Sequence, residues 1–229
     1  MLILALDTSS PWTSCALVDP DRGVVAESLG APPAKAGEIL PRALIDLCPG
    51  GDLSRVDALA VGIGPGSFTG LRVGLAAMKT IAYARKLPLA SASSLHALAL
   101  SAPARGLVVP TLEARRGEVY ACAIEDGAVV APETVLPASA LPAFVAALGR
   151  RASVVGPGAR ANLGSLGSLT VGDEPVAPLA RAVAQIVAGE LRDARYDRDS
   201  VFALAPRYLQ QSAAEIALAE GRVGGLPSP

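Results

Sequence analysis

The acidic side chain best placed for chemistry is Asp7, which ends the apolar run from Leu2 to Leu6 and is followed by Thr8 and Ser9. A carboxylate that a strand delivers to a turn is suited to hold Mg²⁺ beside a nucleotide phosphate. The same residues suit a structural turn, because Asp and Ser side chains hydrogen-bond nearby backbone N–H groups. Two interpretations therefore stay open: nucleotide binding at Asp7, Thr8 and Ser9, or a self-bonded turn.

A glycine-rich segment from Gly62 to Gly74, GIGPGSFTGLRVG, is the second candidate. It follows an apolar run and is typical of a strand, a sharp turn and a helix start, where backbone N–H groups can bind an anion. However, Leu71 stands where a Walker phosphate loop has its lysine, and the third glycine of the dinucleotide fingerprint is missing. Pro65 also removes one donor. A structural turn is the main prediction, and anion binding is the alternative.

Other residues give no sign of catalysis. His96 is the single histidine of the sequence, so no site with two imidazole ligands can form, and no nucleophile elbow accompanies it. Cys15, Cys48 and Cys122 are scattered and odd in number, as expected for reduced thiols of the cytoplasm. We therefore expect no catalytic residue and no metal site.

Composition limits the class of protein further. The 229 residues are 51% hydrophobic, enough for the core of one large or two small domains. A formal net charge of −1 makes unaided nucleic-acid binding unexpected, because that affinity comes mainly from neutralised phosphates. The start lacks a basic leader, and no apolar run is long enough to span a bilayer. We expect a cytoplasmic protein without a membrane association.

Two predicted helices carry apolar stripes. The helix over 36–48 has one at helical spacing: Ile39, Leu40, Ala43, Leu44 and Leu47. The helix over 68–86 has a core-facing stripe: Leu71, Leu75, Met78 and Ala82. It also has a second stripe of small or apolar residues: Gly70, Gly74, Ala77 and Ile81. A glycine inside a helix costs about 1 kcal/mol relative to alanine, so this stripe needs the close approach of another backbone. Spacing alone leaves open whether that backbone belongs to this chain or to a partner.

The order of predicted elements repeats. Three strands, a helix, a strand, a helix, a strand and a helix occupy residues 2–99, and a related order restarts after residue 106 with one helix reduced. This pattern predicts an α/β fold of duplicated ribonuclease-H-like lobes, the architecture of the actin, sugar-kinase and Hsp70 superfamily, with the second lobe reduced. We place the first lobe at 1–104 and the second at 105–229, with a final helix near 212–220 that packs back on the first lobe.

The segment from Gly64 to Gly74, preceded by Leu4–Ser9, resembles the signature of the TsaB family, also called YeaZ. Further matches extend nearly end to end: Glu38-Ile39-Leu40-Pro41, Ser93-Ser94-Leu95, Glu118-Val119-Tyr120 and Pro206-Arg207-Tyr208-Leu209. The resemblance implies the duplicated actin-like fold and a role as the non-catalytic subunit of the bacterial machinery that makes N6-threonylcarbamoyladenosine (t6A) in tRNA.

The resemblance also implies partners. Members form homodimers in isolation and pair with the catalytic paralogue TsaD through a helical bundle, while the ATPase TsaE and tRNA join within the complex. ATP and metal are expected on TsaD, with no cofactor on this chain. Carried over by position, the partner interface would comprise Ile39, Leu40, Ala43, Leu44, Leu47, Gly70, Arg72, Gly74, Ala77, Met78 and Ile81. The chain departs from the usual pattern at Gly37, Glu113 and Gln210, where histidine, aspartate and arginine are common.

An ATP-dependent small kinase or carbamoyl transferase of the actin-like superfamily, using Asp7, is the alternative function. Its two phosphate-binding hairpins look degraded, because residues 7–12 contain no glycine and residues 111–117 have theirs only at Gly117. A peptidase, the third hypothesis, conflicts with the single histidine and the dispersed cysteines.

Overall fold

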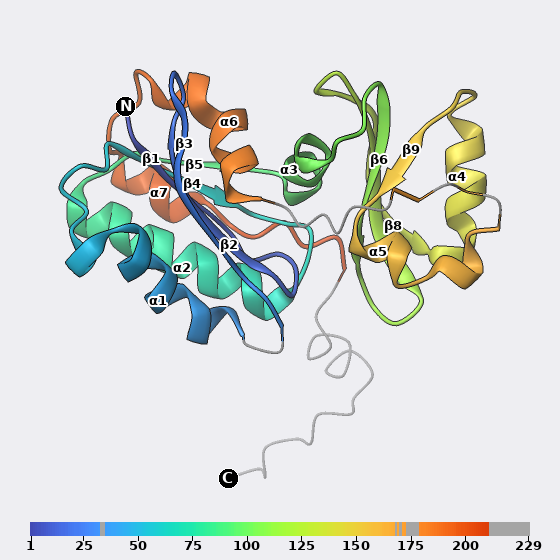
Figure 1. Cartoon of the computed structure of the whole chain (residues 1–229), viewed down its shortest axis with the longest axis horizontal. Helices are drawn as coiled ribbons and strands as arrows, with labels where there is room; N and C mark the ends of the chain where they lie inside the picture. Colours follow the sequence, from blue (N-terminus) through green and yellow to red (C-terminus); the bar gives the residue numbers. More distant parts are fainter. Residues whose placement is uncertain (33–34, 168, 170, 173–178, 211–229) are drawn as a thin grey trace, which may run out of the picture.

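The computed structural model describes residues 1–32, 35–167, 169, 171–172 and 179–210, and it contains two β-sheets side by side (Figure 1). The first sheet has the order β3-β2-β1-β4-β5. β1 runs antiparallel to β2 and parallel to β4, and β4 runs parallel to β5. The strands are β1 (Ile3–Asp7), β2 (Thr13–Asp19), β3 (Gly23–Gly30), β4 (Ala58–Gly62) and β5 (Leu89–Ala92).

Within the described residues, the second sheet repeats this plan with four strands. Its order is β8-β7-β6-β9, with β6 antiparallel to β7 and parallel to β9. The strands are β6 (Leu107–Glu113), β7 (Glu118–Glu125), β8 (Ala128–Pro137) and β9 (Ser153–Val155). After β9, Val171 makes a single parallel bridge to Val154, and Thr170 lies outside the described residues. The duplicated α/β fold with a reduced second lobe is confirmed.

Helices cover both faces of the first sheet. α1 (Ala36–Leu47) and α2 (Phe68–Arg85) pack on one face with Leu4 and Leu6 of β1. α6 (Ala180–Leu191) packs on the other face with Ile3 and Ala5. Successive side chains of a strand point to opposite faces, which explains the alternation along β1. Alanines dominate the α6 side, so helix and sheet can approach closely.

The second sheet is likewise covered on both faces. α4 (Leu141–Ala147), which follows a 3₁₀ turn at Ala138–Ala140, and the short α5 (Pro157–Arg160) pack on one side, and α3 (Ser94–Ser101) packs on the other. The reduced helix of the second lobe is the short α5, which a 3₁₀ turn at Leu163–Ser165 follows. No helix among the described residues is both long and apolar enough to cross a bilayer.

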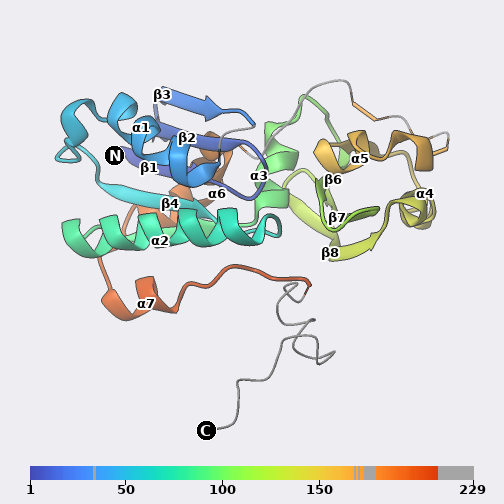
Figure 2. The same ribbon diagram turned by 90° about the horizontal axis from the view of Figure 1, so that it is seen from below.

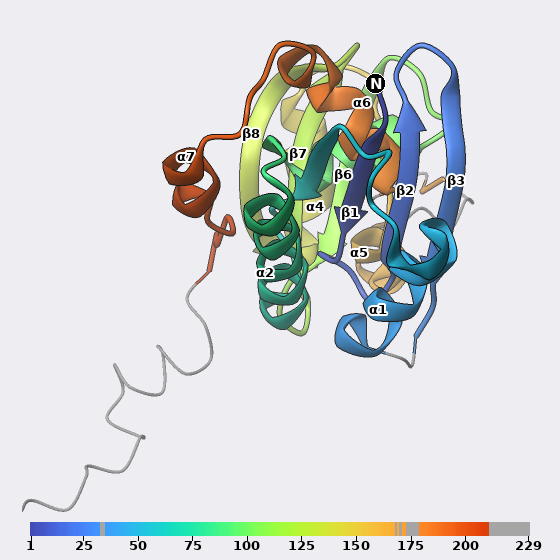
Figure 3. The ribbon, with the colours of Figure 1, turned by 90° about the vertical axis from the view of Figure 1, so that its left-hand side faces the viewer.

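The division at residue 104 needs correction. α3 belongs to the first lobe by sequence but packs against β6 and β7, whereas α6 packs against β1, β2, β4 and β5. α7 (Arg198–Ala203), which the sequence did not predict, contacts α2 (Figures 2 and 3). The lobes thus exchange helices, which contiguous boundaries cannot represent. The helix expected near 212–220 lies outside the described residues.

Candidate functional site

Asp7 lies fully buried at the end of β1, and its hydrogen-bond partners come from the same chain. Its Oδ1 accepts bonds from the Ser9 backbone N (2.9 Å) and Ser9 Oγ (2.6 Å), and its Oδ2 accepts one from Ser94 Oγ (2.7 Å). Burial raises the pKa of Asp7, although the bonds from Ser9 and Ser94 act in the opposite direction. A Cβ at Gly62 of β4 would overlap Asp7 Oδ2. This is the arrangement that a self-bonded turn predicts.

The Gly-Pro-Gly turn after β4 packs on the turn after β1. The Ser67 backbone N donates to the Ser9 carbonyl oxygen (2.6 Å), and a Cβ at Gly66 would overlap that oxygen. Ser67 Oγ accepts a bond from Gly70 N (3.2 Å) and thereby caps the start of α2. Gly64 has a φ of +99°, a conformation that glycine adopts at low cost. The contacts agree with a structural role for this turn.

Gly70 and Gly74 of α2 make room for Thr8. A Cβ at Gly70 would overlap the Thr8 carbonyl oxygen, and a Cβ at Gly74 would overlap Thr8 Oγ1. In the other direction, Thr8 Oγ1 donates a buried hydrogen bond of 2.8 Å to the Gly70 carbonyl oxygen. The segment that approaches Gly70 and Gly74 closely is therefore the turn at Thr8 of this chain. Their assignment to a partner interface was wrong.

Five more predicted interface residues also need correction. Four are buried in the chain's own core: Leu40, Ala43, Leu47 and Met78. Ile39 is turned toward β3, since a Cβ at Gly30 would lie 2.7 Å from Ile39 Cδ1. The regular apolar stripe of a helix marks the side that faces its own sheet, so periodicity selected core residues.

A smaller apolar strip remains accessible along the outer side of the α1–α2 pair. We call it the helix seam and define it as Leu44 and Ile45 of α1 with Val73, Ala77 and Ile81 of α2. Ile45 is 51% exposed, and the other members are half-buried. The sequence prediction included Leu44, Ala77 and Ile81 but missed Ile45 and Val73. Ile45 had a usable signal, because it is an apolar residue away from the core stripe.

A cavity of about 370 Å³ opens at the end of the helix seam, where α1 and α2 begin. Its lining includes Val73, Gly37, Lys35 and Ser10. Gly37 has open space around it, so a larger side chain at this position would fit.

Arg72 lies on the side of α2 away from α1. Its guanidinium carbon is 3.8 Å from the centroid of the Phe68 ring, and its Nε donates to Tyr208 Oη (3.0 Å). Figure 2 shows the segment after α7 running alongside α2. Arg72 was predicted in the partner interface, but it contacts its own chain here and lies outside the helix seam.

The segment after α7 connects the two lobes. Arg207 N donates to the Ile63 carbonyl oxygen (2.7 Å), and Arg207 Nη1 pairs with Glu133 of β8 (2.8 Å). Gln210, one of the departures from the family pattern, donates to Glu118 Oε2 (2.7 Å) and accepts from Tyr120 Oη (3.2 Å). Glu113, another departure, is exposed at the end of β6.

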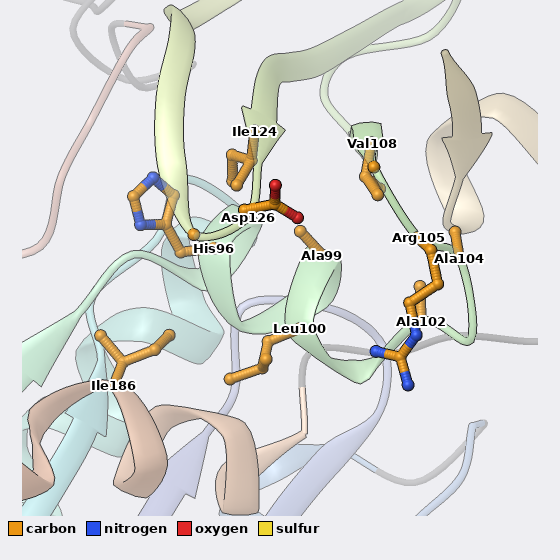
Figure 4. A pocket seen from close by; sticks show the side chains of 12 residues that line it. His96, Ala99, Leu100, Ala102, Ala104, Arg105, Val108, Ile124, Asp126 and Ile186 are labelled. Carbon is orange, nitrogen blue, oxygen red and sulfur yellow. The ribbon is translucent and has the colours of Figure 1, made fainter. Parts of the chain in front are cut away.

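His96 lines a cavity of about 440 Å³ between α3, α6 and the β7–β8 hairpin (Figure 4). Aliphatic side chains form most of its wall, with Arg105 and Asp126 beside them. His96 is half-buried, and its backbone N donates to Ser93 Oγ at the start of α3. Burial lowers its pKa. This agrees with a packed histidine, and the cavity contains no predicted interface or nucleotide-binding residue.

Comparison with known proteins shows sequence similarity over half of the chain. The family model described as "TsaD: tRNA N6-adenosine threonylcarbamoyltransferase" matches residues 39–152. The tRNA threonylcarbamoyladenosine biosynthesis protein TsaB of Bacillus subtilis is 38% identical over 130 residues, 52% of this chain and 53% of the relative. TsaB of Escherichia coli is 37% identical over 124 residues, again 52% of this chain and 53% of the relative. The chain thus spans about half the length of the curated relatives it matches.

Structural similarity extends further along the chain. YeaZ from Pseudomonas aeruginosa superimposes with a TM-score of 0.70 at 25% identity, covering 91% of this chain and 99% of that one. A crystal structure described as an uncharacterized protein similar to peptidase YeaZ, also from Pseudomonas aeruginosa, gives 0.71 at 26% identity with the same coverage. The sequence similarity and the structural similarity both support the TsaB/YeaZ family for this chain.

Proposed function

We propose that this chain is a non-catalytic subunit of t6A synthesis, which supports a TsaD-family threonylcarbamoyltransferase by packing helices against it. The names of the TsaB relatives indicate the process, which is the biosynthesis of threonylcarbamoyladenosine in tRNA. The observation that carries the scaffold role is the helix seam, where the half-buried Leu44, Ala77 and Ile81 border the same core cluster and Ile45, which follows Leu44 on α1, is 51% exposed. Exposed apolar side chains that lie together on two adjacent helices are suited to burial in a protein interface.

The similarity to the TsaD family supports this choice of partner. Residues 39–152, which include most of α1 and all of α2, match that family's model. Two chains of related fold can associate through equivalent helices in a pseudo-symmetric arrangement, in which each apolar strip covers the other. The same strip would serve a homodimer of this chain in isolation.

The geometry at Asp7 supports a non-catalytic role. Both carboxylate oxygens already accept hydrogen bonds from Ser9 and Ser94, so a magnesium ion would have to displace them. We therefore assign ATP and metal to the TsaD partner and no cofactor to this chain. TsaE and tRNA would join within the complex, in the cytoplasm.

Co-purification with the TsaD-family subunit of the source organism tests the proposal. Ile45→Glu and Ala77→Glu place a carboxylate in the helix seam, and each should abolish co-purification because the charge would be buried without a partner. Val129→Glu on β8 is the matched control, since Val129 is 53% exposed and far from the seam in sequence. Its pairing should equal that of the wild type. Equal pairing by all three variants would refute the proposed contact.

Two further measurements test the pathway and the alternative enzyme. Depletion of this protein should remove the t6A signal from digested tRNA in mass spectrometry, and an unchanged signal would contradict the proposed role. Calorimetry of the isolated chain with ATP should show no binding at Asp7. Micromolar affinity that Asp7→Ala abolishes would favour the ATP-dependent enzyme instead.

A further inference from the structure

Figure 3 shows α7 beside α2. The side of α2 that faces α7 carries aromatic and cationic side chains, most of them exposed. We call this surface the aromatic–cationic stripe and define it by six residues: Arg72, Lys79, Tyr83 and Lys86 along α2, Phe202 of α7 and Tyr208 after it. The four positions along α2 are seven, four and three residues apart, so helical geometry places them on one side. The exposed fractions are 48% for Tyr83, 52% for Phe202 and 40% for Tyr208.

The rings and cations of the stripe are arranged as one continuous group. The Tyr83 and Phe202 rings meet edge to face with centroids 5.9 Å apart. Lys86 Nζ lies 4.2 Å from the Tyr83 centroid, and Lys79 Nζ donates to the Phe202 carbonyl oxygen (2.8 Å). At the other end, Phe68 and Arg72 contact Tyr208. These contacts hold the rings in place, while about half of the Tyr83 and Phe202 side chains stays accessible.

The charge of α2 has one sign. Its charged residues are Arg72, Lys79 and Arg85, with Lys86 directly after it, and it contains no aspartate or glutamate. The adjacent α7 carries one residue of each sign, Arg198 and Asp199, and Asp197 before it is the helix cap that accepts bonds from the backbone N atoms of Asp199 and Ser200. A chain whose formal net charge is −1 therefore concentrates positive charge at this surface.

This combination fits RNA better than a second protein. The buried centres of protein interfaces are depleted in charged residues, lysine in particular. Nucleic acid requires what the stripe has, namely cations for phosphates and aromatic faces on which bases stack. Bases of a duplex already stack on one another, so rings of this kind bind bases of single-stranded loops.

We propose that the aromatic–cationic stripe binds a single-stranded loop of RNA, and that this RNA is the tRNA on which the complex acts. Bases would stack on Tyr83 and Phe202, and Lys79 and Lys86 would contact phosphates. The choice of tRNA rests on the proposed function. The stripe lies on the side of α2 opposite to α1, so the helix seam stays available to the protein partner.

Fluorescence polarisation with a labelled anticodon stem–loop RNA tests this inference on the full chain. The wild type should bind with a dissociation constant between about 1 and 100 μM at low salt, the range of electrostatically driven contacts. Lys79→Gln/Lys86→Gln should weaken binding about tenfold and reduce the slope of log affinity against log salt by about 1.4, since each single-strand phosphate contact contributes about 0.7. Phe202→Ala should weaken binding about tenfold through lost stacking.

Arg105→Gln/Arg151→Gln is the matched control, because it removes the same charge from exposed positions of the second lobe. Its affinity should stay within about twofold of the wild type. Equal losses in the two double variants, equal binding to a duplex without a loop, or no binding by the wild type at about 100 μM would each overturn the inference. The measurement needs only this chain and RNA, so its failure is separate from failed pairing with the TsaD-family subunit.

Discussion

Replacing Gly74 by alanine tests whether the glycines of α2 serve the fold or a partner. In the structure, a Cβ at this position would overlap Thr8 Oγ1 and lie 3.3 Å from Thr8 Cβ. Thr8 Oγ1 also donates the buried 2.8 Å bond to the Gly70 carbonyl oxygen, so moving it away from a new methyl group would break that bond. Gly74→Ala should therefore destabilise the isolated chain.

The expected loss combines three contributions. Overpacking a close-packed site costs about 1–3 kcal/mol. Leaving a buried carbonyl or hydroxyl unpaired costs about 1–3 kcal/mol more. Alanine in a helix returns about 1 kcal/mol relative to glycine. The free energy of unfolding should thus fall by about 3 kcal/mol. Gly189→Ala in α6 is the control, because nothing lies within 4 Å of its Cβ position, and it should gain up to about 1 kcal/mol.

Urea unfolding of the isolated chain, followed by circular dichroism, measures these changes. A double-mutant cycle with Thr8→Ala isolates the contact, because that variant removes the oxygen that Gly74→Ala would hit. In the Thr8→Ala background, the cost of Gly74→Ala should shrink by about 2 kcal/mol or more. A Gly74→Ala variant as stable as the wild type, or a cycle without coupling, would refute the packing argument and return Gly74 to the list of candidate partner contacts.

Three other predictions concern titratable groups whose pKa is shifted by burial. Because burial raises the folded-state pKa of Asp7 above its ordinary 3.8, the native state binds more protons than the unfolded state above that pH, and wild-type stability falls as pH rises there. Asp7→Asn should therefore gain stability relative to the wild type from about pH 4 to pH 7 in urea titrations, and a relative loss would contradict this. Burial lowers the pKa of His96 below its ordinary 6.5, so the contribution of this residue to stability is lost as pH falls through that region. An NMR titration of this histidine should have its midpoint below 6.5, and a midpoint above 6.5 would refute the assignment. Burial raises the pKa of Cys15 and Cys122 to about 12, and Cys48 is also buried. A thiol reagent at about pH 8 should therefore label all three cysteines in urea and none in the native chain. Rapid labelling of the native chain would contradict the structure.

The elements that the sequence predicted well are those with strong local signals. The helix expected over 68–86 is α2 (Phe68–Arg85), with Ser67 at its cap. The three-stranded meander at the start and its repeat after residue 106 also follow local patterns of apolar runs and turns. These local signals sufficed to predict the duplicated fold, because each strand or helix could be assigned from its own stretch of sequence without knowledge of what it packs against.

Packing between distant segments could not be predicted in the same way. Nothing near residue 180 in the sequence indicates that α6 returns to the first sheet, where its alanines meet Ala5 and Ala60. α7 is only six residues long, and its contact with α2 depends on Phe202 and Tyr83 across more than a hundred residues. Short elements that are stabilised by tertiary contacts leave little periodicity to detect.

The same distinction explains why the interface prediction selected several wrong residues. The long glycine motif that resembles the family signature is accounted for by the turn at Thr8 and Ser9, which packs against Gly66, Gly70 and Gly74. A motif can therefore be diagnostic of a fold without forming the surface that binds a partner. A partner must therefore bind α2 through its remaining two sides. One side carries Ala77 in the helix seam, and the other side carries Tyr83 in the aromatic–cationic stripe. Since these surfaces share one helix and no residue, variants of each should separate protein pairing from RNA binding in the same chain.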